Sequence, residues 1–423
     1  MSQDVLPSSP ILEATSYRHK IYDAVHGFIR FNDLEKMLID SEPFQRLHYI
    51  HQLGISFLVY PGATHTRFEH SLGTMELATR IFDPLTAKSR GVHEDLGYWR
   101  QVVRLAALCH DLGHLPFSHV AEKALLGRGG HERWTLAVIQ STGLAPLWEA
   151  FQKEYPEYTV LTDVIKAALG EKKCEELGLG LAFSPWHRAM TEMITGDFFG
   201  ADRIDYLLRD AQCTGVSYGL FDYHQLIEML CLLPEPHLGG LGVEENGIAS
   251  CEALLLARHF MHQRVYQYPT SKSYAFHLAR FMTTLYRAKG YLQTLEAYLS
   301  VTDNEVLTAL RQALGDPSHE GHADAQALLK RHRRFFAVDL GKKVTAADLE
   351  ALQKELGIPQ GEIDWNLSVV DGEAGPSFSV LKRSGEVVDS GACSELFIPK
   401  AGKNWAFIAP EYAPALKKAL ESL

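Results

Sequence analysis

The sequence predicts a mainly α-helical protein with a small α/β region at its C-terminal end. Apolar residues recur at helical spacing in long blocks such as "RFEHSLGTMELATRIF" (67–82) and "YWRQVVRLAALCHDLG". Towards the C-terminus the pattern changes to short β-like runs separated by turns. We therefore expect a helical domain at 15–334 and a small α/β region at 335–423, preceded by an N-terminal tail at 1–14.

Local signals support these elements in chain order. Residues 20–55 mix apolar and polar residues at helical spacing, and "ISFLVYPGAT" (55–64) is β-like up to its Pro-Gly turn. Helical spacing returns at 67–140 and continues, with a glycine-rich interruption, to residue 183. Two strong helical blocks follow, "RAMTEMITGDFFGADRIDYLLRDAQCTG" and "CEALLLARHFMHQRVYQYPT", separated by the loop "PEPHLGGLGVEENG". The C-terminal region combines one helix, "TAADLEALQKEL", with the β-like runs "FFAVDL", "WNLSVVD", "FSVLKRSGEVVDS" and "WAFIAP".

Composition excludes several classes of protein. Hydrophobic residues make up 46% and charged residues 22% of the 423, as in ordinary soluble proteins. No stretch is long and apolar enough to span a membrane, and the N-terminus lacks the layout of a signal peptide, so we expect a cytoplasmic protein. The six cysteines form no C-x-x-C pair and are expected to be reduced core residues. A net charge of −11 disfavours strong nucleic-acid binding, although it permits a phosphate-bearing small molecule.

A histidine-rich stretch centred on "CHDLGHLPFSH" (109–119) suggests metal chemistry. An imidazole and a carboxylate, His110 and Asp111, stand together where an apolar helix ends, and this pair suits Mn, Fe or Zn. Two ligands do not complete a site, so further ligands must come from elsewhere in the chain. His70 is the best upstream candidate, and "GADRIDYLLRD" holds the best downstream candidate.

Two helical stripes predict the walls of a polar cavity. Asp202, Tyr206 and Asp210 are spaced by four residues, and so are Arg258, His262 and Tyr266. Each residue also has an ordinary structural explanation. Asp202 could cap a helix, Arg258 and Tyr266 could extend along a surface, and His131 could be a loop histidine.

The motifs also resemble a known family. His70, the His110–Asp111 pair and Asp202 resemble the H…HD…D signature of the HD phosphohydrolase superfamily. Longer strings, "QLGISFLVYPGATHTRFEHSLGT", "CHDLGHLPFSH" and "ADRIDYLLRD", closely resemble the deoxynucleoside triphosphate (dNTP) triphosphohydrolases, both the animal sterile-alpha-motif/HD-domain enzyme and its bacterial relatives. The resemblance covers roughly residues 20–340 and implies a helical HD-domain core.

The resemblance assigns roles to individual residues. It implies a metal held by His70, His110, Asp111 and Asp202, with Mg on the substrate phosphates. His131 matches the catalytic acid or base, and Arg67 also acts at the reacting phosphate. The residues matching the triphosphate contacts are Arg67, His114, His119, Arg203, Tyr206 and Arg258. The residues matching the sugar contacts are Gln52, Leu53, Asp210, Tyr266 and the neighbouring Gln267, with Leu53 and Tyr266 crowding the 2′ position.

The reaction implied by the resemblance is attack of water at the α-phosphorus of a dNTP, which releases deoxynucleoside and intact triphosphate. The residues alone indicate a metal-dependent phosphohydrolase. Two alternatives remain: an HD phosphohydrolase acting on nucleoside monophosphates or another phosphorylated metabolite, and a nucleotide-binding module with little turnover. The chain has no P-loop, so phosphate is not expected to be bound in that way. By analogy with related helical enzymes, a homo-oligomer is expected.

Overall fold

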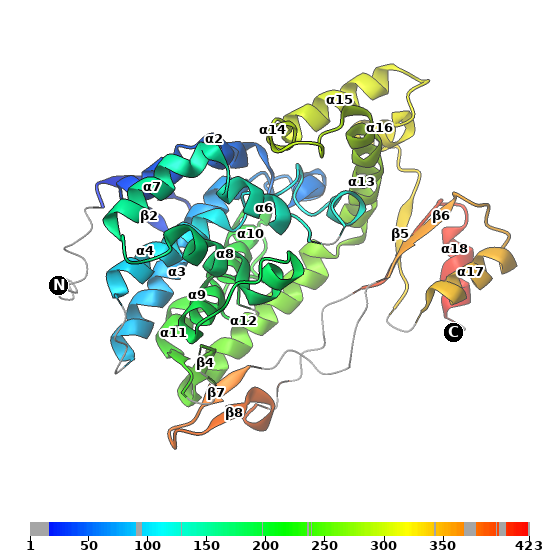
Figure 1. The fold of residues 1–423 in the computed structure, drawn as a ribbon. Helices are drawn as coiled ribbons and strands as arrows, with labels where there is room; N and C mark the ends of the chain where they lie inside the picture. The colour runs from blue at the N-terminus through cyan, green and yellow to red at the C-terminus, as the bar shows by residue number, and fades with distance from the viewer. Residues whose placement is uncertain are drawn as a thin grey trace, which may run out of the picture.

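The computed structural model describes residues 17–89, 95–127, 129–196, 198–234, 237, 239–341, 344–367, 378–394, 396 and 403–421. The predicted N-terminal tail, 1–14, lies outside the described residues. Helices dominate the described chain, so the prediction of a mainly helical fold is confirmed (Figure 1). No described helix is long and apolar enough to cross a lipid bilayer.

The centre of the main core is formed by α3 and α4. Helix α4 is buried from Tyr98 to Cys109, and its buried Arg104 is paired with Glu35. Helix α3 packs along α4 and α10, while α8 covers α4 and α9. This half of the molecule comprises α1 (Asp33–Ile39), α2 (Glu42–Gln45), η2 (Arg46–Tyr49), η3 (Gly54–Leu58), α3 (Arg67–Lys88), α4 (Leu96–Cys109), α5 (Glu122–Leu125), α6 (Glu132–Ile139), η4 (Thr142–Leu144), α7 (Ala145–Glu154), α8 (Val160–Glu176), α9 (Pro185–Thr195), α10 (Ala201–Thr214) and α11 (Tyr223–Met229).

A second apolar cluster forms where the later helices pack on the loop after α4. Leu115 and Phe117 of that loop are buried against α13, and Tyr298 and Val306 complete the cluster. The remaining described helices are η5 (Glu245–Gly247), α12 (Ile248–Met261), the π-helix η6 (His262–Tyr266), α13 (Pro269–Lys289), α14 (Leu295–Leu299), α15 (Asp303–Gly315), α16 (His322–Leu329), α17 (Ala346–Glu355), η7 (Ser390–Ala392) and α18 (Ala413–Leu420).

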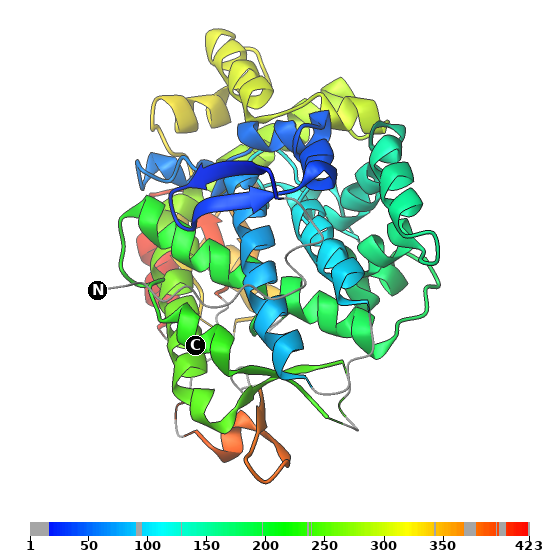
Figure 2. The same cartoon turned by 90° about the vertical axis from the view of Figure 1, so that its left-hand side faces the viewer.

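Three small sheets complete the described fold. An antiparallel hairpin, β1 (His19–Asp23) with β2 (Gly27–Phe31), lies against α3, as Figure 2 shows. A four-stranded sheet has the order β3 (Leu230–Leu232), β4 (Leu241–Glu244), β7 (Ser379–Leu381), β8 (Val387–Asp389), with β4 and β7 parallel. A three-stranded sheet has the order β5 (Phe336–Asp339), β9 (Trp405–Ile408), β6 (Ile363–Asn366).

The structure corrects three local predictions. Residues 19–31 form a hairpin where helical spacing was expected, because alternate residues of β2 face the core. The β-like stretch 55–64 begins as a 3₁₀ helix, η3, whose Ile55 is buried beside α13. The predicted loop 234–247 contains β4, which pairs antiparallel with β3 on one edge and parallel with β7 on the other.

The C-terminal elements agree with their signals. The predicted helix is α17, and three of the β-like runs are β5, the β7–β8 hairpin and β9. The fourth run begins in β6, and its residues 368–371 lie outside the described part of the chain. Strand β7 pairs with β4, so this stretch of 335–423 shares a sheet with the helical part.

Candidate metal centre and catalytic cavity

Four predicted metal ligands converge from three helices. His70 comes from α3, His110 and Asp111 follow the last turn of α4, and Asp202 lies in the first turn of α10. One ligand atom each of His70, His110 and Asp202 lie within 4.8 Å of one another. Asp111 Oδ2 is 3.5 Å from His70 Nε2, and Asp111 Oδ1 is 3.3 Å from His110 Nε2. Gly200 is the N-cap of α10, and Asp202 is the second residue of the helix. Asp202 therefore does not cap the helix, and its carboxylate faces the histidines.

The imidazoles are oriented to present a lone pair to a common point. His70 Nδ1 donates to Asp205 Oδ2 at 2.7 Å, and His110 Nδ1 donates to the carbonyl of Ala107 at 2.7 Å. The opposite nitrogens, His70 Nε2 and His110 Nε2, are buried without a hydrogen bond of good geometry and face Asp202 Oδ1 at 3.0 Å and 3.8 Å. Two orphaned imidazole nitrogens beside two carboxylates fit a borderline divalent ion, which would satisfy all four groups.

A buried shell of charges holds His70 in place. Asp205 accepts hydrogen bonds from His70, from His26 Nε2 at 2.7 Å and from Arg209 at 2.9 Å. Gly73 makes room for this carboxylate, since a Cβ at that position would lie 1.9 Å from Asp205 Oδ1. The interactions with Arg209, His26 and His70 outweigh the effect of burial and keep the pKa of Asp205 well below its usual range. The carboxylate is therefore ionised, as a partner of a metal-bound histidine must be.

Asp111 connects the ligand cluster to the rest of the cavity. Arg67 Nη1 donates to its Oδ2, and Arg67 Nε donates to Ser118 Oγ at 2.8 Å. His114 Nε2 lies 3.1 Å from Asp111 Oδ1. Although burial opposes ionisation, the charges of Arg67 and the nearby histidines hold the pKa of Asp111 well below its usual range. Arg67 therefore positions the side chains of Asp111 and Ser118.

The loop after the His-Asp pair is tightly packed and strained. A Cβ on Gly113 would lie 2.1 Å from the backbone nitrogen of Thr135, so only glycine lets this loop contact the segment carrying His131. Phe117 and Ser118 adopt left-handed backbone angles, with φ of 56° and 59°, which cost non-glycine residues energy. The buried carboxylate of Asp303 stabilises this conformation by accepting from the Phe117 backbone nitrogen at 2.6 Å.

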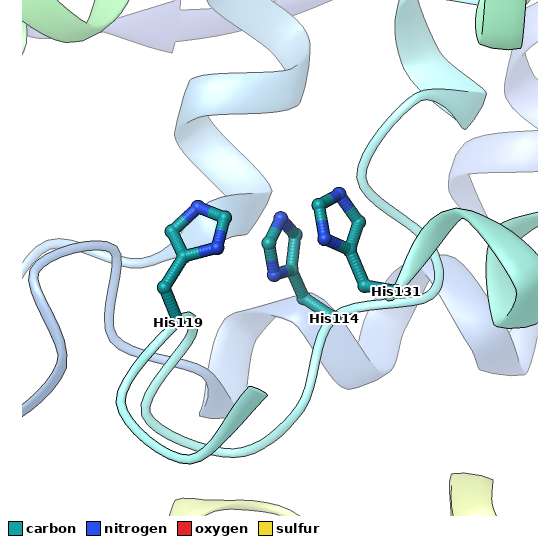
Figure 3. Close-up of side chains that lie close together, drawn as sticks. All are labelled: His114, His119 and His131. Carbon is teal, nitrogen blue, oxygen red and sulfur yellow. The ribbon is translucent and has the colours of Figure 1, made fainter. Parts of the chain in front are cut away.

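His114, His119 and His131 form a compact histidine cluster, which Figure 3 shows with His114 in the middle. The rings of His114 and His131 stack with centroids 3.7 Å apart, and those of His114 and His119 lie 4.6 Å apart. Glu122 accepts from His131 Nδ1 at 2.8 Å and from His119 Nδ1 at 2.5 Å. The bond to Nδ1 orients His131 and leaves its Nε2 for proton exchange.

Protonation states differ across the cluster. Burial, reinforced by the charges of Arg67 and His131, lowers the pKa of His114 well below its usual value, so His114 is neutral at pH 7. Although burial opposes it, the hydrogen bonds from His119 and His131 lower the pKa of Glu122, which is therefore ionised. An ionised carboxylate behind an imidazole stabilises that imidazole when it carries a proton.

A cavity of about 1600 Å³ opens over the metal ligands and the histidine cluster. The predicted stripe of α10 is confirmed, since Asp202, Tyr206 and Asp210 all line this cavity. His262 and Tyr266 of η6 also line this cavity. A π-helix at this position is a common feature of functional sites, because its wider turn changes which side chains face inward.

One side of the cavity matches the predicted sugar contacts. Tyr266 donates its hydroxyl to Asp210 Oδ2 at 2.7 Å, and His65 Nε2 lies 2.7 Å from Asp210 Oδ1. Gln52 and Leu53 also line the cavity, and the buried Gln52 Oε1 makes no hydrogen bond within the described chain. An unsatisfied amide oxygen beside a bridged carboxylate and a phenol suits a hydroxyl-bearing ligand.

Three predicted substrate residues lie at the margin of the cavity. Arg203 Nε is 3.4 Å from the Tyr206 hydroxyl, and its Nη1 donates to the carbonyl of Gly196. Arg258 and Arg203 are close enough to His262 for their charges to lower its pKa. Gln267 Oε1 accepts from Trp405 Nε1 at 2.9 Å, which ties it to β9. Among the described residues, none of Arg203, Arg258 and Gln267 lines the cavity itself.

The sequence prediction missed the residues that orient the site. Asp205 stands three positions after Asp202, so the string "ADRID" could have suggested a second inward carboxylate. Glu122, His26 and Asp303 carry no such signal, because their partners are remote in the chain or lie in irregular loops.

The comparisons with known families match this geometry. A model described as the HD domain matches residues 67–175, which contain His70, His110, Asp111 and His131. Residues 67–175 of the chain are therefore an HD domain. A second model, the HD associated region, matches residues 221–386 and so includes η6, α13 and β7. The HD domain implies a divalent metal site, and the cluster of His70, His110, Asp111 and Asp202 fits one.

Several individual proteins are similar to this chain in sequence or in structure. An uncharacterized protein of Methanocaldococcus jannaschii is 36% identical over 59% of this chain and 46% of its own length. The deoxynucleoside triphosphate triphosphohydrolase SAMHD1 of Homo sapiens is 29% identical over 79% of this chain and 58% of its own length. The chain thus spans about half the length of the curated relatives it matches. The crystal structure of a hypothetical protein from Aquifex aeolicus covers 95% of this chain and 99% of its own, with 28% identity and a TM-score of 0.73.

Proposed function

We propose that this HD-domain protein is a metal-dependent phosphohydrolase that converts a dNTP and water to deoxynucleoside and triphosphate. The observation that carries the proposal is one continuous wall of the cavity. It joins the ligand cluster to His131 through Asp111 and His114, with the Tyr266–Asp210 pair in the same cavity. One ligand could therefore occupy both the site for the reacting phosphorus and the site for a sugar.

The chemistry divides between the ion and the protein. A divalent ion held by His70, His110, Asp111 and Asp202 would supply Lewis-acid polarisation of the phosphoryl oxygen and a water of lowered pKa. His131 donates a proton from Nε2 to the leaving 5′ oxygen, and Glu122 stabilises the protonated ring. The attacking water gives one proton to solvent, and its oxygen bonds to the α-phosphorus as the bond to the 5′ oxygen breaks. The neutral His114 and the cationic Arg67 stabilise charge on the phosphoryl oxygens.

The sugar side of the cavity supports a nucleotide substrate. Gln52 Oε1 and Asp210 offer acceptors to a 3′-hydroxyl, and the ring of Tyr266 occupies space that a 2′-hydroxyl would need. Leu53 adds apolar bulk on the same side. The similarity to the human deoxynucleoside triphosphate triphosphohydrolase SAMHD1 agrees with this choice.

The test is to incubate the purified protein with each dNTP and NTP in Mn²⁺ or Mg²⁺ and to separate the products by ion exchange. We expect deoxynucleoside and triphosphate in equal amounts, with ribonucleotides turned over poorly. Release of orthophosphate or pyrophosphate would show attack at another phosphorus. Turnover of nucleoside monophosphates alone would favour a monoesterase, and the same assay includes dNMPs for that reason.

A further inference from the structure

The first turn of α13 presents two polar side chains to the cavity that the proposed reaction does not use. Ser271 and Lys272 follow Pro269, where this 21-residue helix begins, and both line the cavity. The same face of α13 continues along the cavity through Phe276 and Arg280. The cavity is therefore walled on this side by one long helix whose N-terminal end carries a cation.

Lys272 differs from two other cations that line the cavity in having no carboxylate partner among the described residues. Arg280 lies 3.5 Å from Asp324, and Lys173 lies 3.1 Å from Glu132. In the part of the chain that the structure describes, no carboxylate forms an ion pair with Lys272, whose pKa is lowered by burial alone. A partly buried ammonium group without an acid is costly unless an anion accompanies it.

Ser271 gives an independent indication of a ligand at the same place. Its side chain is only 5% exposed, and its hydroxyl makes no hydrogen bond to any described residue. Buried hydroxyls are almost always satisfied, so an unsatisfied one lining a cavity marks a position where a ligand oxygen binds. The free N–H groups of the first turn add a further positive field.

The surroundings of His262 show that the positive charge is concentrated here. Burial is the main cause that lowers the pKa of His262 to about 4, followed by the charges of Arg258, Arg203 and Lys272. His262 is therefore neutral, and the cationic side chains of Arg258, Arg203 and Lys272 lie near it. His262 Nδ1 is buried and makes no hydrogen bond among the described residues.

We propose that Lys272 and Ser271 bind the terminal phosphate of a polyphosphate chain. The reacting phosphorus is assigned to the region between the ligand cluster and His131, whereas Lys272 lines the cavity from the first turn of α13, near enough to His262 for its charge to help lower the pKa of that ring. A phosphate at Lys272 is therefore a different one from the phosphate under attack. This inference rests on the proposed function. It adds that the cavity selects substrates by the length of their polyphosphate chain.

The test measures binding of inorganic triphosphate and of orthophosphate by calorimetry, using the full chain with no added metal. Lys272→Met should weaken triphosphate binding about 10- to 100-fold, the loss of one charge-assisted hydrogen bond, and leave orthophosphate binding unchanged. Ser271→Ala should weaken triphosphate binding about 2- to 10-fold. Lys272→Arg should retain most of the affinity, since it restores the charge.

Lys289→Met is the matched control, because Lys289 is exposed near the other end of α13. It should bind both anions like the wild type, and thermal unfolding should confirm that all variants are folded. Wild-type protein that does not bind triphosphate, or Lys272→Met with wild-type affinity, would overturn the subsite. Equal weakening of both anions would place Lys272 at the reacting phosphate and overturn the assignment to the terminal one.

The two proposals can fail separately. If the wild type hydrolyses no dNTP but its triphosphate binding depends on Lys272, the terminal-phosphate subsite stands and the proposed reaction does not. If dNTPs are hydrolysed, Lys272→Met should raise the KM for a dNTP far more than it lowers kcat. A kcat that falls with an unchanged KM would show that Lys272 acts in the chemical step and contradict the subsite.

Discussion

The two sides of the cavity are built differently. On the metal side, His70, His110 and Asp111 are buried and are fixed by groups outside the ligand set, such as Asp205 behind His70 and Arg67 beside Asp111. On the sugar side, Gln52 and Tyr266 are only half-buried. There the side chains position one another by direct hydrogen bonds, such as the one from the Tyr266 hydroxyl to Asp210.

The difference shows what each side tolerates. A metal cluster needs ligand atoms fixed within tenths of an ångström, so its supporting charges are buried and irreplaceable. A sugar site needs a shape and a few hydrogen bonds, so a change there should alter selectivity before it abolishes turnover. Substitutions on the two sides should therefore give different kinds of defect.

The largest effect is expected from removing a ligand. His110→Ala or Asp202→Ala should lose bound metal and reduce hydrolysis to background, because the three remaining ligands cannot replace a lost donor. Metal content by mass spectrometry and a product assay test this together. Asp210→Ala, the matched change on the sugar side, should retain metal, and loss of metal in that variant would remove the contrast between the two sides.

Next in size is the loss of the proton donor. His131→Ala should retain metal and substrate binding, while kcat falls roughly 10²- to 10⁴-fold, the usual contribution of a general acid. Single-turnover kinetics separates binding from chemistry. A variant that keeps wild-type kcat would show that His131 only packs against His114.

A smaller effect is expected one contact away from the metal. Asp205→Asn keeps the shape of the side chain but removes the negative charge that orients His70, so metal affinity should fall about 10- to 100-fold. Titration of apoprotein with Mn²⁺ measures this. Because Asp205 also pairs with Arg209, unfolding in urea should be followed in parallel, and an unchanged metal affinity would limit Asp205 to a structural role.

On the sugar side, Tyr266→Ala should change selectivity more than rate. Removal of the ring opens the space assigned to a 2′-hydroxyl, so the preference for dNTP over NTP should fall roughly tenfold. The ratio of kcat/KM values for a matched dNTP and NTP is the measurement. An unchanged ratio would show that Tyr266 serves only to bind Asp210.

The smallest effect concerns stability and pH. Burial opposes protonation of His65, but its hydrogen bond to Asp210 and the neighbouring Cys213 raise the pKa to about 9. Because the folded pKa exceeds the unfolded value of about 6.5, this stabilisation is complete below about pH 6.5 and is lost as the pH rises through 9. Urea unfolding from pH 6 to 9.5 should show a decline that is smaller in His65→Gln. Parallel declines in both proteins would contradict this assignment.

The sequence was sufficient for some features because their signals are local. The four ligands stand in short motifs at helix ends, and their convergence needs only that α3, α4 and α10 pack together, as apolar periodicity suggests. The β1–β2 hairpin was missed because five-residue strands give little periodicity. The roles of Glu122 and Asp303 could not be predicted, because each depends on a loop conformation that only the packed structure defines.

The contact between Gln267 and Trp405 has a consequence for how the molecule folds. These residues are 138 positions apart, and β4 likewise pairs with β7 across a long stretch of chain. Contacts of this separation form late and slow the folding of a domain. During synthesis, the segment carrying Tyr266 therefore emerges from the ribosome well before the strand that supports it. A ribosome-bound chain ending before β7 should expose the edge of β4 and bind chaperones there.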